Sequence, residues 1–589
     1  MLDYSAPLRD MQFVLNELIG FDQICALAGT DDISLDLSNA VLEEASKFAK
    51  DVLAPLNRIG DIEGSRLNGD EVVTPKGWQE AYTSFKDSGW CSLAMSLEYG
   101  GQGFPKVIAT AVYEMWDSAN MSFSLCPLLT NGAIEAIHSH GDDTLKSTYL
   151  EKLVSGDWAG TMNLTEPQAG SDLGAVRTKA VPEGTYYRIK GQKIYITYGE
   201  HDLTENIIHL VLARTPDAPE GVKGISLFVV PKFIVNESGS LGDRNDVKCI
   251  SLEHKLGIHA SPTAVMSYGE SAGAIGYLVG EENSGLMYMF TMMNAARHAV
   301  GREGMAISEA SFQLAHSYAT TRVQGQPLGG GTIIRHPDVK RMLMTMKSKI
   351  EAMRALTYVC AFEYDLTERH NDEKQRAQSR RRGDLLTPIV KGWCTEVAQE
   401  LTSLGVQVHG GMGFVEETGA AQYQRDARIT TIYEGTTGIQ AGDLVGRKTL
   451  GDGGRGMEEL IADMLISVNS LDESIVGMKK IKSALAASVD DLKTAVAWLL
   501  SNANDPQLPS AAASSYLQLA GITCGGWMMA KSAALSAVKL KDSECEPFYL
   551  EKITSAVFYS TQVMPFTRAL LTAIQNGSAD IANLDLESA

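Results

Sequence analysis

One segment in the first half of the sequence, residues 159–280, constrains the fold more than any other. It contains the runs GTYYRIKGQKIYIT, IIHLVLAR and GISLFVVPK, which are rich in Ile, Val, Tyr and Thr and are bounded by Gly and Pro. Such runs predict the short strands of a sandwich or barrel. The sequence therefore predicts a β-domain between the two flanking segments of the chain.

Helical patterns lie on both sides of this segment. Before it, apolar residues recur at helical spacing in LSNAVLEEASKFAKDVLAPLN, a helix that we expect Pro55 to end. After it, helical patterning runs from Leu286 to about Leu450 and resumes in a further module, where an apolar stripe begins at Leu485. The prediction is a mainly α chain of four domains: an N-terminal helical domain (1–158), a middle β-domain (159–283), a helical bundle (284–449) and an additional C-terminal helical domain (450–589).

Composition excludes several classes of partner. The 589 residues include 51 basic and 72 acidic ones, a net charge of −21, without a long basic run. Neither nucleic acid nor an anionic membrane is an expected partner of such a chain. The eight cysteines form no CxxC pair and MLDYSAPLRD has no signal-peptide pattern, so we expect a cytoplasmic protein of bacterial type. AAASSYLQLAGITCGGWMMA predicts a buried helix or helix pair, and no integral membrane segment is expected.

The segment from Gln407 to Asp443, QVHGGMGFVEETGAAQYQRDARITTIYEGTTGIQAGD, combines glycine-rich turns with one acid in an apolar setting. That acid, Glu434, follows Ile and Tyr and precedes Gly. Partial burial disfavours the charge of a carboxylate and raises its pKa, as a general base requires. The alternative is a helix-capping glutamate, or one in a salt bridge with Arg425 or Arg428.

Several motifs occur in an order that resembles one enzyme family. IYEGTTGIQ resembles the segment that carries the catalytic glutamate of acyl-CoA dehydrogenases, with QVHGGMGF and YQRDARI upstream. TMNLTEPQAGSDL and KIYITYGEHD resemble the two flavin loops of that family, NAARHAVGREG the start of its C-terminal bundle, and TTRVQGQPLGG its arginine segment. The whole chain, with its long C-terminal module, resembles the bacterial long-form branch, which includes fatty acyl-CoA and 3-(methylthio)propanoyl-CoA dehydrogenases.

The resemblance implies the acyl-CoA dehydrogenase fold and FAD-dependent α,β-desaturation of an acyl-CoA thioester, the first step of fatty acyl-CoA β-oxidation. The β-hydride needs a cofactor because no side chain accepts a hydride. By resemblance, Glu434 removes the α-proton and the hydride goes to N5 of FAD. The residues implied to contact FAD are Met162, Leu164, Thr165, Ser171, Tyr195, Thr197, Arg322, Gln407, Gly410, Gly411 and Thr436. Those implied to contact the substrate are Ser171, Asn294, Arg297 and Gly435.

Ordinary structural roles compete with these assignments. The serine and threonines of the flavin motifs also suit caps, turns and strands, and Arg322 suits a solvated helix end as well as a pyrophosphate. Asn294 replaces an acid common in the family, and VQGQPLGG lacks the aromatic residue that usually follows the arginine. No metal site is expected: His254 and His259 lie in EHKLGIH without further ligands nearby, so they are interpreted as loop histidines.

The expected electron acceptor is an electron-transfer flavoprotein, and a homodimer is predicted. An oxidase of the same fold, which reduces O₂, is an alternative that the sequence does not separate from a dehydrogenase. A DNA-binding alkylation-response flavoprotein is another, against which the net charge of −21 argues. A C-terminal module that serves interaction or membrane association is a third. Acyl chain length stays open, with 3-(methylthio)propanoyl-CoA as the alternative to a fatty acyl-CoA.

Overall fold

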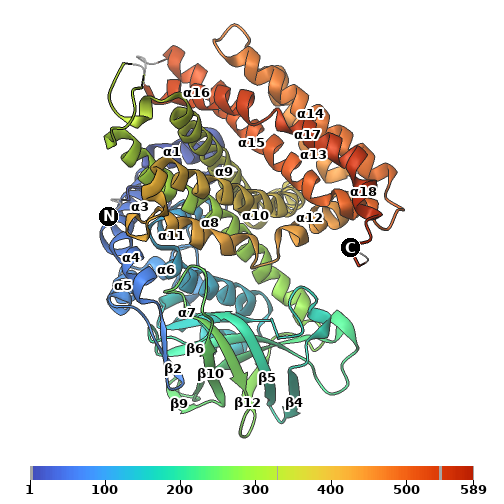
Figure 1. The fold of residues 1–589 in the computed structure, drawn as a ribbon. Helices are drawn as coiled ribbons and strands as arrows, with labels where there is room; N and C mark the ends of the chain where they lie inside the picture. Colours follow the sequence, from blue (N-terminus) through green and yellow to red (C-terminus); the bar gives the residue numbers. More distant parts are fainter. Residues whose placement is uncertain (1–3, 328, 543–546, 588–589) are drawn as a thin grey trace. The chain divides into compact units, whose positions relative to one another are not determined.

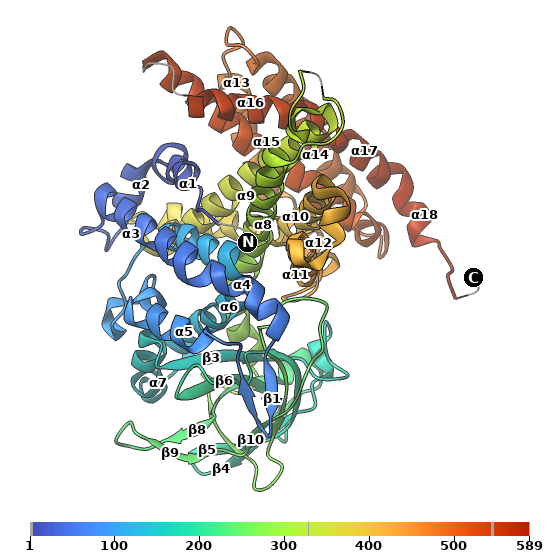
Figure 2. The ribbon, with the colours of Figure 1, turned by 60° about the vertical axis from the view of Figure 1, so that its left-hand side comes forward.

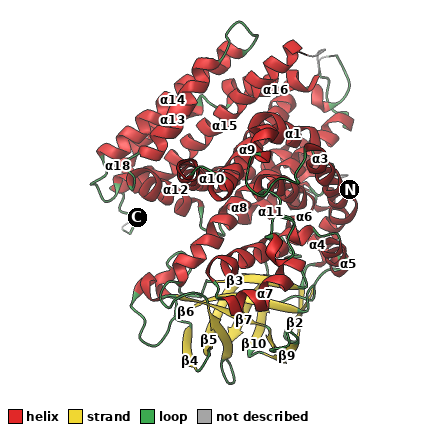
Figure 3. Ribbon diagram, turned by 180° about the vertical axis from the view of Figure 1, so that it is seen from behind, coloured by secondary structure: helices red, strands yellow, loops and turns green. Residues whose placement is uncertain are grey.

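The computed structural model describes residues 4–327, 329–542 and 547–587. They form two compact units (Figure 1). Unit 1 combines the N-terminal residues up to Ser46, Pro105–Ser118, and the chain from Arg297 onward; unit 2 combines Lys47–Phe104 with Ala119–Ala296. The segments α6 (Lys106–His140), which is kinked at Asn120, and α8 (Gly285–Thr321) each contribute to both units. The mainly α fold with a β-domain in the middle of the chain is confirmed (Figure 3).

Unit 2 is built around an eight-stranded sheet with the order β10-β11-β5-β12-β7-β6-β3, in which β4 also pairs with β5. Neighbouring strands are antiparallel except β3 and β6, which are parallel. The three runs singled out in the sequence form β5, β6 and β7, as predicted. The strands are β3 (Trp158–Asn163), β4 (Lys179–Glu183), β5 (Tyr186–Thr197), β6 (Asn206–Ala213), β7 (Ser226–Pro231), β10 (Val247–Leu252), β11 (Thr263–Tyr268) and β12 (Ala274–Leu278).

The sheet of unit 2 separates two apolar cores. On β6, Leu210 and Leu212 pack into a core shared with α6 and α7 (Asp143–Ser155), whereas Val211 and Ala213 pack into a core made mainly by other strands. Successive side chains of a strand point to opposite faces. Every residue of β6 is buried, as expected for a strand covered on both faces.

Smaller elements complete unit 2. They are the hairpins β1–β2 (Arg66–Asn68, Glu71–Val73) and β8–β9 (Phe233–Val235, Leu241–Arg244), and the helices α4 (Ala54–Glu63) and α5 (Trp78–Asp87). The prediction that Pro55 ends a helix is wrong. The helix α3 (Leu35–Phe48) continues through a π-helical turn into α4, where Pro55 occupies the first turn. Proline has no N–H to donate into the preceding turn, and the hydrogen-bond pattern changes to π-helical directly before it.

Unit 1 is helical. Its longest helices include α8, α9 and α10, and the C-terminal extension contributes α13 to α18, coloured orange to red in Figure 2. Besides α3, the helices are α1 (Leu8–Gln12), α2 (Phe21–Cys25), α9 (Pro337–Arg369), α10 (Glu373–His409), α11 (Ala420–Ala427), α12 (Thr437–Val445), α13 (Arg455–Ser470), α14 (Met478–Ser501), α15 (Leu508–Asp542), α16 (Pro547–Gln562), α17 (Phe566–Thr572) and α18 (Ser578–Ala582). The predicted stripe of α14, which begins at Leu485, is buried.

Helix α15 is the centre of the extension. It contacts α9, α10 and α12 of the bundle as well as α14, α16, α17 and α18. The approach to α10 is close: a Cβ atom added at Gly521 would lie 2.2 Å from Cγ of the buried Trp393. The apolar stretch in α15 is thus part of one buried helix, and within the described residues no helix is long and apolar enough to cross a membrane.

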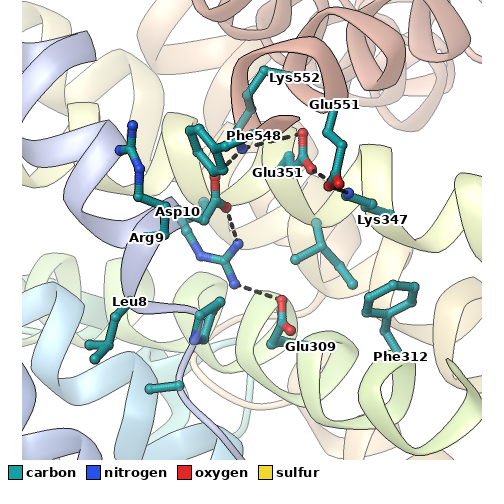
Figure 4. Close-up of a pocket in the computed structure, with 14 residues that line it drawn as sticks. Leu8, Arg9, Asp10, Glu309, Phe312, Lys347, Glu351, Phe548, Glu551 and Lys552 are labelled. Carbon is teal, nitrogen blue, oxygen red and sulfur yellow. Dashed lines mark hydrogen bonds and ion pairs between the residues drawn. The ribbon is translucent and has the colours of Figure 1, made fainter. Parts of the chain in front are cut away.

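A buried charge cluster ties three parts of unit 1 together (Figure 4). Arg354 of α9 bonds to Asp10 of α1 at 2.5 Å and to Glu309 of α8 at 2.7 Å. Asp10 also pairs with Lys552 of α16. These residues line a cavity of about 480 Å³. Because each charge faces an opposite one, the cluster joins the N-terminal helix and the extension to the bundle.

The described cysteines form no crosslink. The seven described ones are free, and all but Cys25 are buried. Cys545 lies outside the described residues.

Candidate active site

Glu434 lies on a tight turn between the 3-10 helix Arg428–Thr431 and α12. Its backbone is left-handed, with φ +54°, and Gly435 follows with φ +87°. This conformation is uncommon for a residue with a Cβ and persists where surrounding structure holds it. The turn presents a half-buried glutamate side chain whose carboxylate makes no hydrogen bond or ion pair within the described residues.

The surroundings of Glu434 change its acidity. Burial raises the pKa of the Glu434 carboxyl above its ordinary value, while the positive charges of Arg297 and Lys391 act in the opposite direction. Arg297 lies on α8 and is buried, and its Nη1 is 3.4 Å from Oδ2 of Asp443. The result is a carboxylate more basic than one in water and kept ionisable by nearby cations.

The alternative structural role of Glu434 is wrong. Arg425 pairs with Glu416 at 2.9 Å, and Arg428 bonds to Thr431. Glu434 is therefore in no salt bridge with either arginine, and it caps no helix, because the N-cap of α12 is Thr436.

Two residues that the motif analysis missed hold the turn. Lys391 of α10 donates to the Gly435 carbonyl at 2.6 Å, and Gln440 of α12 donates to the carbonyls of Glu434 and Gly435 at 3.2 and 3.3 Å. Burial lowers the pKa of Lys391 to about 8, against the effect of the Glu434 charge. A lone lysine in the apolar run LLTPIVKGWC was the available signal.

The predicted flavin residues of unit 2 come from the ends of β3 and β5. The backbone N–H of Ile194 donates to the Thr165 carbonyl at 2.9 Å, which joins the two segments. Tyr195 has φ +61° and is 60% exposed. Leu164 and Thr197 are half-buried close by in sequence, Ser171 is exposed in the loop, and Met162 packs into the core of unit 2. Asn294, on α8, is half-buried in the same unit.

A buried ion pair braces these two segments. Lys193 of β5 lies 2.8 Å from Oε1 of Glu166 and also donates to the Leu164 carbonyl at 2.9 Å. Glu166 accepts further bonds from the N–H of Arg177 and from the N–H and hydroxyl of Thr178. Thr165 lies in the loop after β3, and the next helical turn, Leu173–Ala175, has Asp172 as its N-cap.

The remaining predicted FAD residues are in unit 1. Arg322 directly follows α8, and Gln407 is in the last turn of α10; both are exposed. Those helix ends lie together, since the rings of Tyr318 and His409 are 4.6 Å apart. Gly410 and Gly411 follow α10 and are exposed, with open space where a Cβ would be. Thr436 is exposed at the N-terminus of α12, a position that favours an anionic group.

One of the two histidines of the loop motif has protein partners. His259 contacts the carbonyls of Asp61 and Lys255 at 2.8 and 3.0 Å. Across the part of the chain that the structure describes, no group of three His, Cys, Asp or Glu side chains is placed to hold a metal ion.

Comparison with known proteins defines the class. Family models for the N-terminal, middle and C-terminal domains of acyl-CoA dehydrogenase match residues 37–157, 161–269 and 283–448, and a model described as acetyl-CoA dehydrogenase C-terminal like matches 457–585. The chain therefore belongs to the acyl-CoA dehydrogenase family. It is an FAD-dependent oxidoreductase, as the resemblance implied.

Individual relatives cover nearly the whole chain. The 3-methylmercaptopropionyl-CoA dehydrogenase of Ruegeria pomeroyi is 50% identical, over 96% of each chain. A butyryl-CoA dehydrogenase of Syntrophomonas wolfei is 35% identical, over 99% of this chain and 98% of the relative. Caenorhabditis elegans ACDH-11, solved in complex with C11-CoA, has the same fold with a TM-score of 0.78 at 20% identity, over 96% of this chain and 92% of that one.

The residues present fit FAD. Hydrogen bonds among the described residues use none of the hydroxyls of Thr165, Ser171, Tyr195 and Thr197, so these groups are available to a ligand. The exposed Tyr195 ring provides a surface for an aromatic ring system. In unit 1, Arg322 is exposed and the glycines after α10 have open space where a Cβ would be; an accessible guanidinium and an unobstructed backbone suit a pyrophosphate.

Proposed function

We propose that this protein introduces a double bond between the α and β carbons of a short acyl-CoA thioester, with Glu434 as the base. The proposal rests on the surroundings of the Glu434 carboxylate. It makes no hydrogen bond or ion pair with the described residues, it is enclosed enough for burial to raise its pKa, and it is held on a strained turn. An unpaired acid with raised pKa on a rigid turn is what α-proton removal requires.

The chain's own groups account for the proton transfer. The Glu434 carboxylate takes the α-proton, and the cations of Arg297 and Lys391 keep it ionised beforehand. The backbone N–H of Glu434 makes no hydrogen bond within the described residues, which leaves it free to donate to the thioester oxygen as negative charge develops there. When bound, FAD supplies the acceptor for the β-hydride.

The proposed substrate is 3-(methylthio)propanoyl-CoA. The support is the half-identical relative named for that acyl group, which spans almost the whole chain. Butanoyl-CoA ranks second, because another full-length relative is named for it. The two acyl groups are short, so longer chains should be poorer substrates.

The decisive experiment is anaerobic bleaching of the flavin absorbance of the holoenzyme. The panel is 3-(methylthio)propanoyl-, butanoyl-, octanoyl- and palmitoyl-CoA, with Glu434→Gln alongside. Loss of a general base costs about 10²–10⁴-fold in rate, so the variant should bleach slowly while still binding thioester. Equal rates in wild type and variant would remove Glu434 from the mechanism. Fastest bleaching by palmitoyl-CoA would reject the short-chain proposal.

The proposed electron acceptor is an electron-transfer flavoprotein. Reduced enzyme mixed with air in a stopped-flow instrument should reoxidise slowly, and fast reoxidation without an added acceptor would identify an oxidase instead.

We also propose a homodimer. Phe414 is 88% exposed and Met412 47% exposed beside the glycines after α10, an apolar surface that a second copy of the chain would cover. Light scattering that gives a monomer or a tetramer contradicts this.

A further inference from the structure

A second buried carboxyl group lies next to the turn that carries Glu434. Glu303 of α8 is fully buried, and its Oε2 accepts a hydrogen bond from the hydroxyl of Tyr433. Its Oε1 has no hydrogen-bond partner among the described residues. Its side chain is sealed from solvent, and its hydrogen bond to Tyr433, the residue directly before Glu434, joins it to the turn.

The turn needs support on both sides. Glu434 is an L residue held at φ +54°, a conformation that is unfavourable unless surrounding contacts maintain it. After Glu434, the Lys391 ammonium and the Gln440 amide bond to the backbone carbonyls. Before Glu434, the Tyr433 side chain is anchored by its bond to Glu303. Removing that anchor releases one side of the turn.

We propose that Glu303 is a positioning residue for the base: by bonding to the Tyr433 hydroxyl it holds the turn in the shape that aims the Glu434 carboxylate at the substrate. The effect on rate rests on the proposed function of Glu434, whereas the effect on the turn does not.

The groups around Glu303 favour an un-ionised acid. Asp117 of α6 is already paired with Arg302, whose Nε is 2.7 Å from Asp117 Oδ2. Burial raises the pKa of Glu303 to about 8, and the Asp117 charge acts in the same direction. The tyrosine hydroxyl and Arg302 lower the pKa, and Glu434 raises it. The negative charge of Glu303 also acts on Lys391 of α10, whose pKa it raises.

An un-ionised Glu303 suits a position beside the base. A carboxylic acid still accepts the tyrosine hydrogen bond through one oxygen, yet it adds no second negative charge near Glu434. Glutamine has the same shape and can accept the same bond through its amide oxygen. The Glu303→Gln variant is therefore the conservative replacement, and Glu303→Ala removes the anchor.

Two readouts on the holoenzyme test this without substrate. The peptide containing residues 429–440 should exchange its amide hydrogens faster in Glu303→Ala and Tyr433→Phe than in wild type, but not in Glu303→Gln. The infrared difference spectrum between wild type and Glu303→Gln at neutral pH should contain the carbonyl band of an un-ionised carboxyl group. Glu309→Gln is the matched control, because Glu309 is a buried acid of the same helix that pairs with Arg354.

Anaerobic bleaching is the third readout. A misplaced reacting group costs about 100-fold in rate, so Glu303→Ala and Tyr433→Phe should bleach about 100-fold more slowly with thioester affinity retained. The double variant should be no slower than either single one, because both remove the same bond. Glu303→Gln and Glu309→Gln should remain close to wild type.

Several outcomes overturn the proposal. Unchanged exchange of the turn in both Glu303→Ala and Tyr433→Phe would show that the bond does not hold it. Multiplied losses in the double variant would show independent roles. Absence of the infrared band would show an ionised Glu303 and overturn only its un-ionised state, because a carboxylate also accepts the tyrosine hydrogen bond. If Glu303→Ala fails to fold, Tyr433→Phe alone decides the exchange and bleaching tests. If wild type is not bleached by any thioester, the proposed function fails while the exchange and infrared results still decide the role of Glu303.

Discussion

Replacing Lys193 by methionine tests the brace between the two predicted flavin segments. The change removes a fully buried ammonium that lies 2.8 Å from Glu166 and 2.9 Å from the Leu164 carbonyl. Burial lowers the pKa of Lys193 to about 8. Glu166 is also buried, which raises its pKa, but Lys193 and the hydrogen bonds outweigh this and lower the value to about 2.

The free-energy cost of Lys193→Met depends on the hydrogen bonds that Glu166 keeps. Removing one partner of a buried ion pair costs about 3–5 kcal/mol. Glu166 keeps its bonds from Arg177 and Thr178, so the cost in Lys193→Met should be near the lower end. About 3 kcal/mol corresponds to roughly a hundredfold change in a local opening equilibrium.

Hydrogen exchange of peptides in residues 160–200, read by mass spectrometry, measures that opening directly. Protection should fall about a hundredfold in Lys193→Met, and FAD should be lost more readily during dilution. The matched control is Lys248→Met. Lys248 is 3.7 Å from Glu270 with both side chains about half exposed, and such surface pairs contribute about 0–1 kcal/mol. Equal losses of protection in the two variants would refute the reasoning. A Glu166→Gln/Lys193→Met double variant should lose less than the sum of the singles.

Two further predictions concern stability. Burial, with the nearby charge of Lys232, lowers the pKa of His201 and His209 to about 3. The unfolded chain regains an ordinary value of about 6.5, so stability is full above that pH and falls as pH drops from about 6.5 toward 3. The denaturation midpoint should therefore be lower at about pH 5.5 than at about pH 7.5, and His209→Gln should reduce the difference; an equal midpoint contradicts this. Gly521→Ala should destabilise by about 1–3 kcal/mol and expose the extension to protease, because its Cβ would overlap Trp393. Gly577→Ala, with open space at its Cβ, is the control, and equal behaviour of the two would reject the close packing.

Local sequence patterns predicted much of the architecture. The runs that became β5, β6 and β7 were recognisable because strand side chains alternate and because Val, Ile and Tyr suit a pleated, buried surface. The stripe of α14 was recognisable for the corresponding helical reason. Pro55 was misjudged because a proline does not always end a helix: the helix continues through a π-helical turn before Pro55, and Pro388 lies inside α10.

Local sequence patterns did not predict the division into two units. Helices α6 and α8 look continuous in sequence, yet each contributes to both units. Periodicity reports which residues share a face of one element, and it carries no information about which other element covers that face.

The candidate active site also has a part that the sequence predicted and a part that it did not. The sequence by itself determined that Glu434 is the candidate base, because a short motif and its apolar neighbours sit within a few residues of it. Its electrostatic setting was decided by the tertiary structure. Lys391 is 44 positions from the carbonyl it holds, and Glu303 is 130 positions from Tyr433. Burial and the distance between charges set a pKa, and both are fixed only when the helices pack.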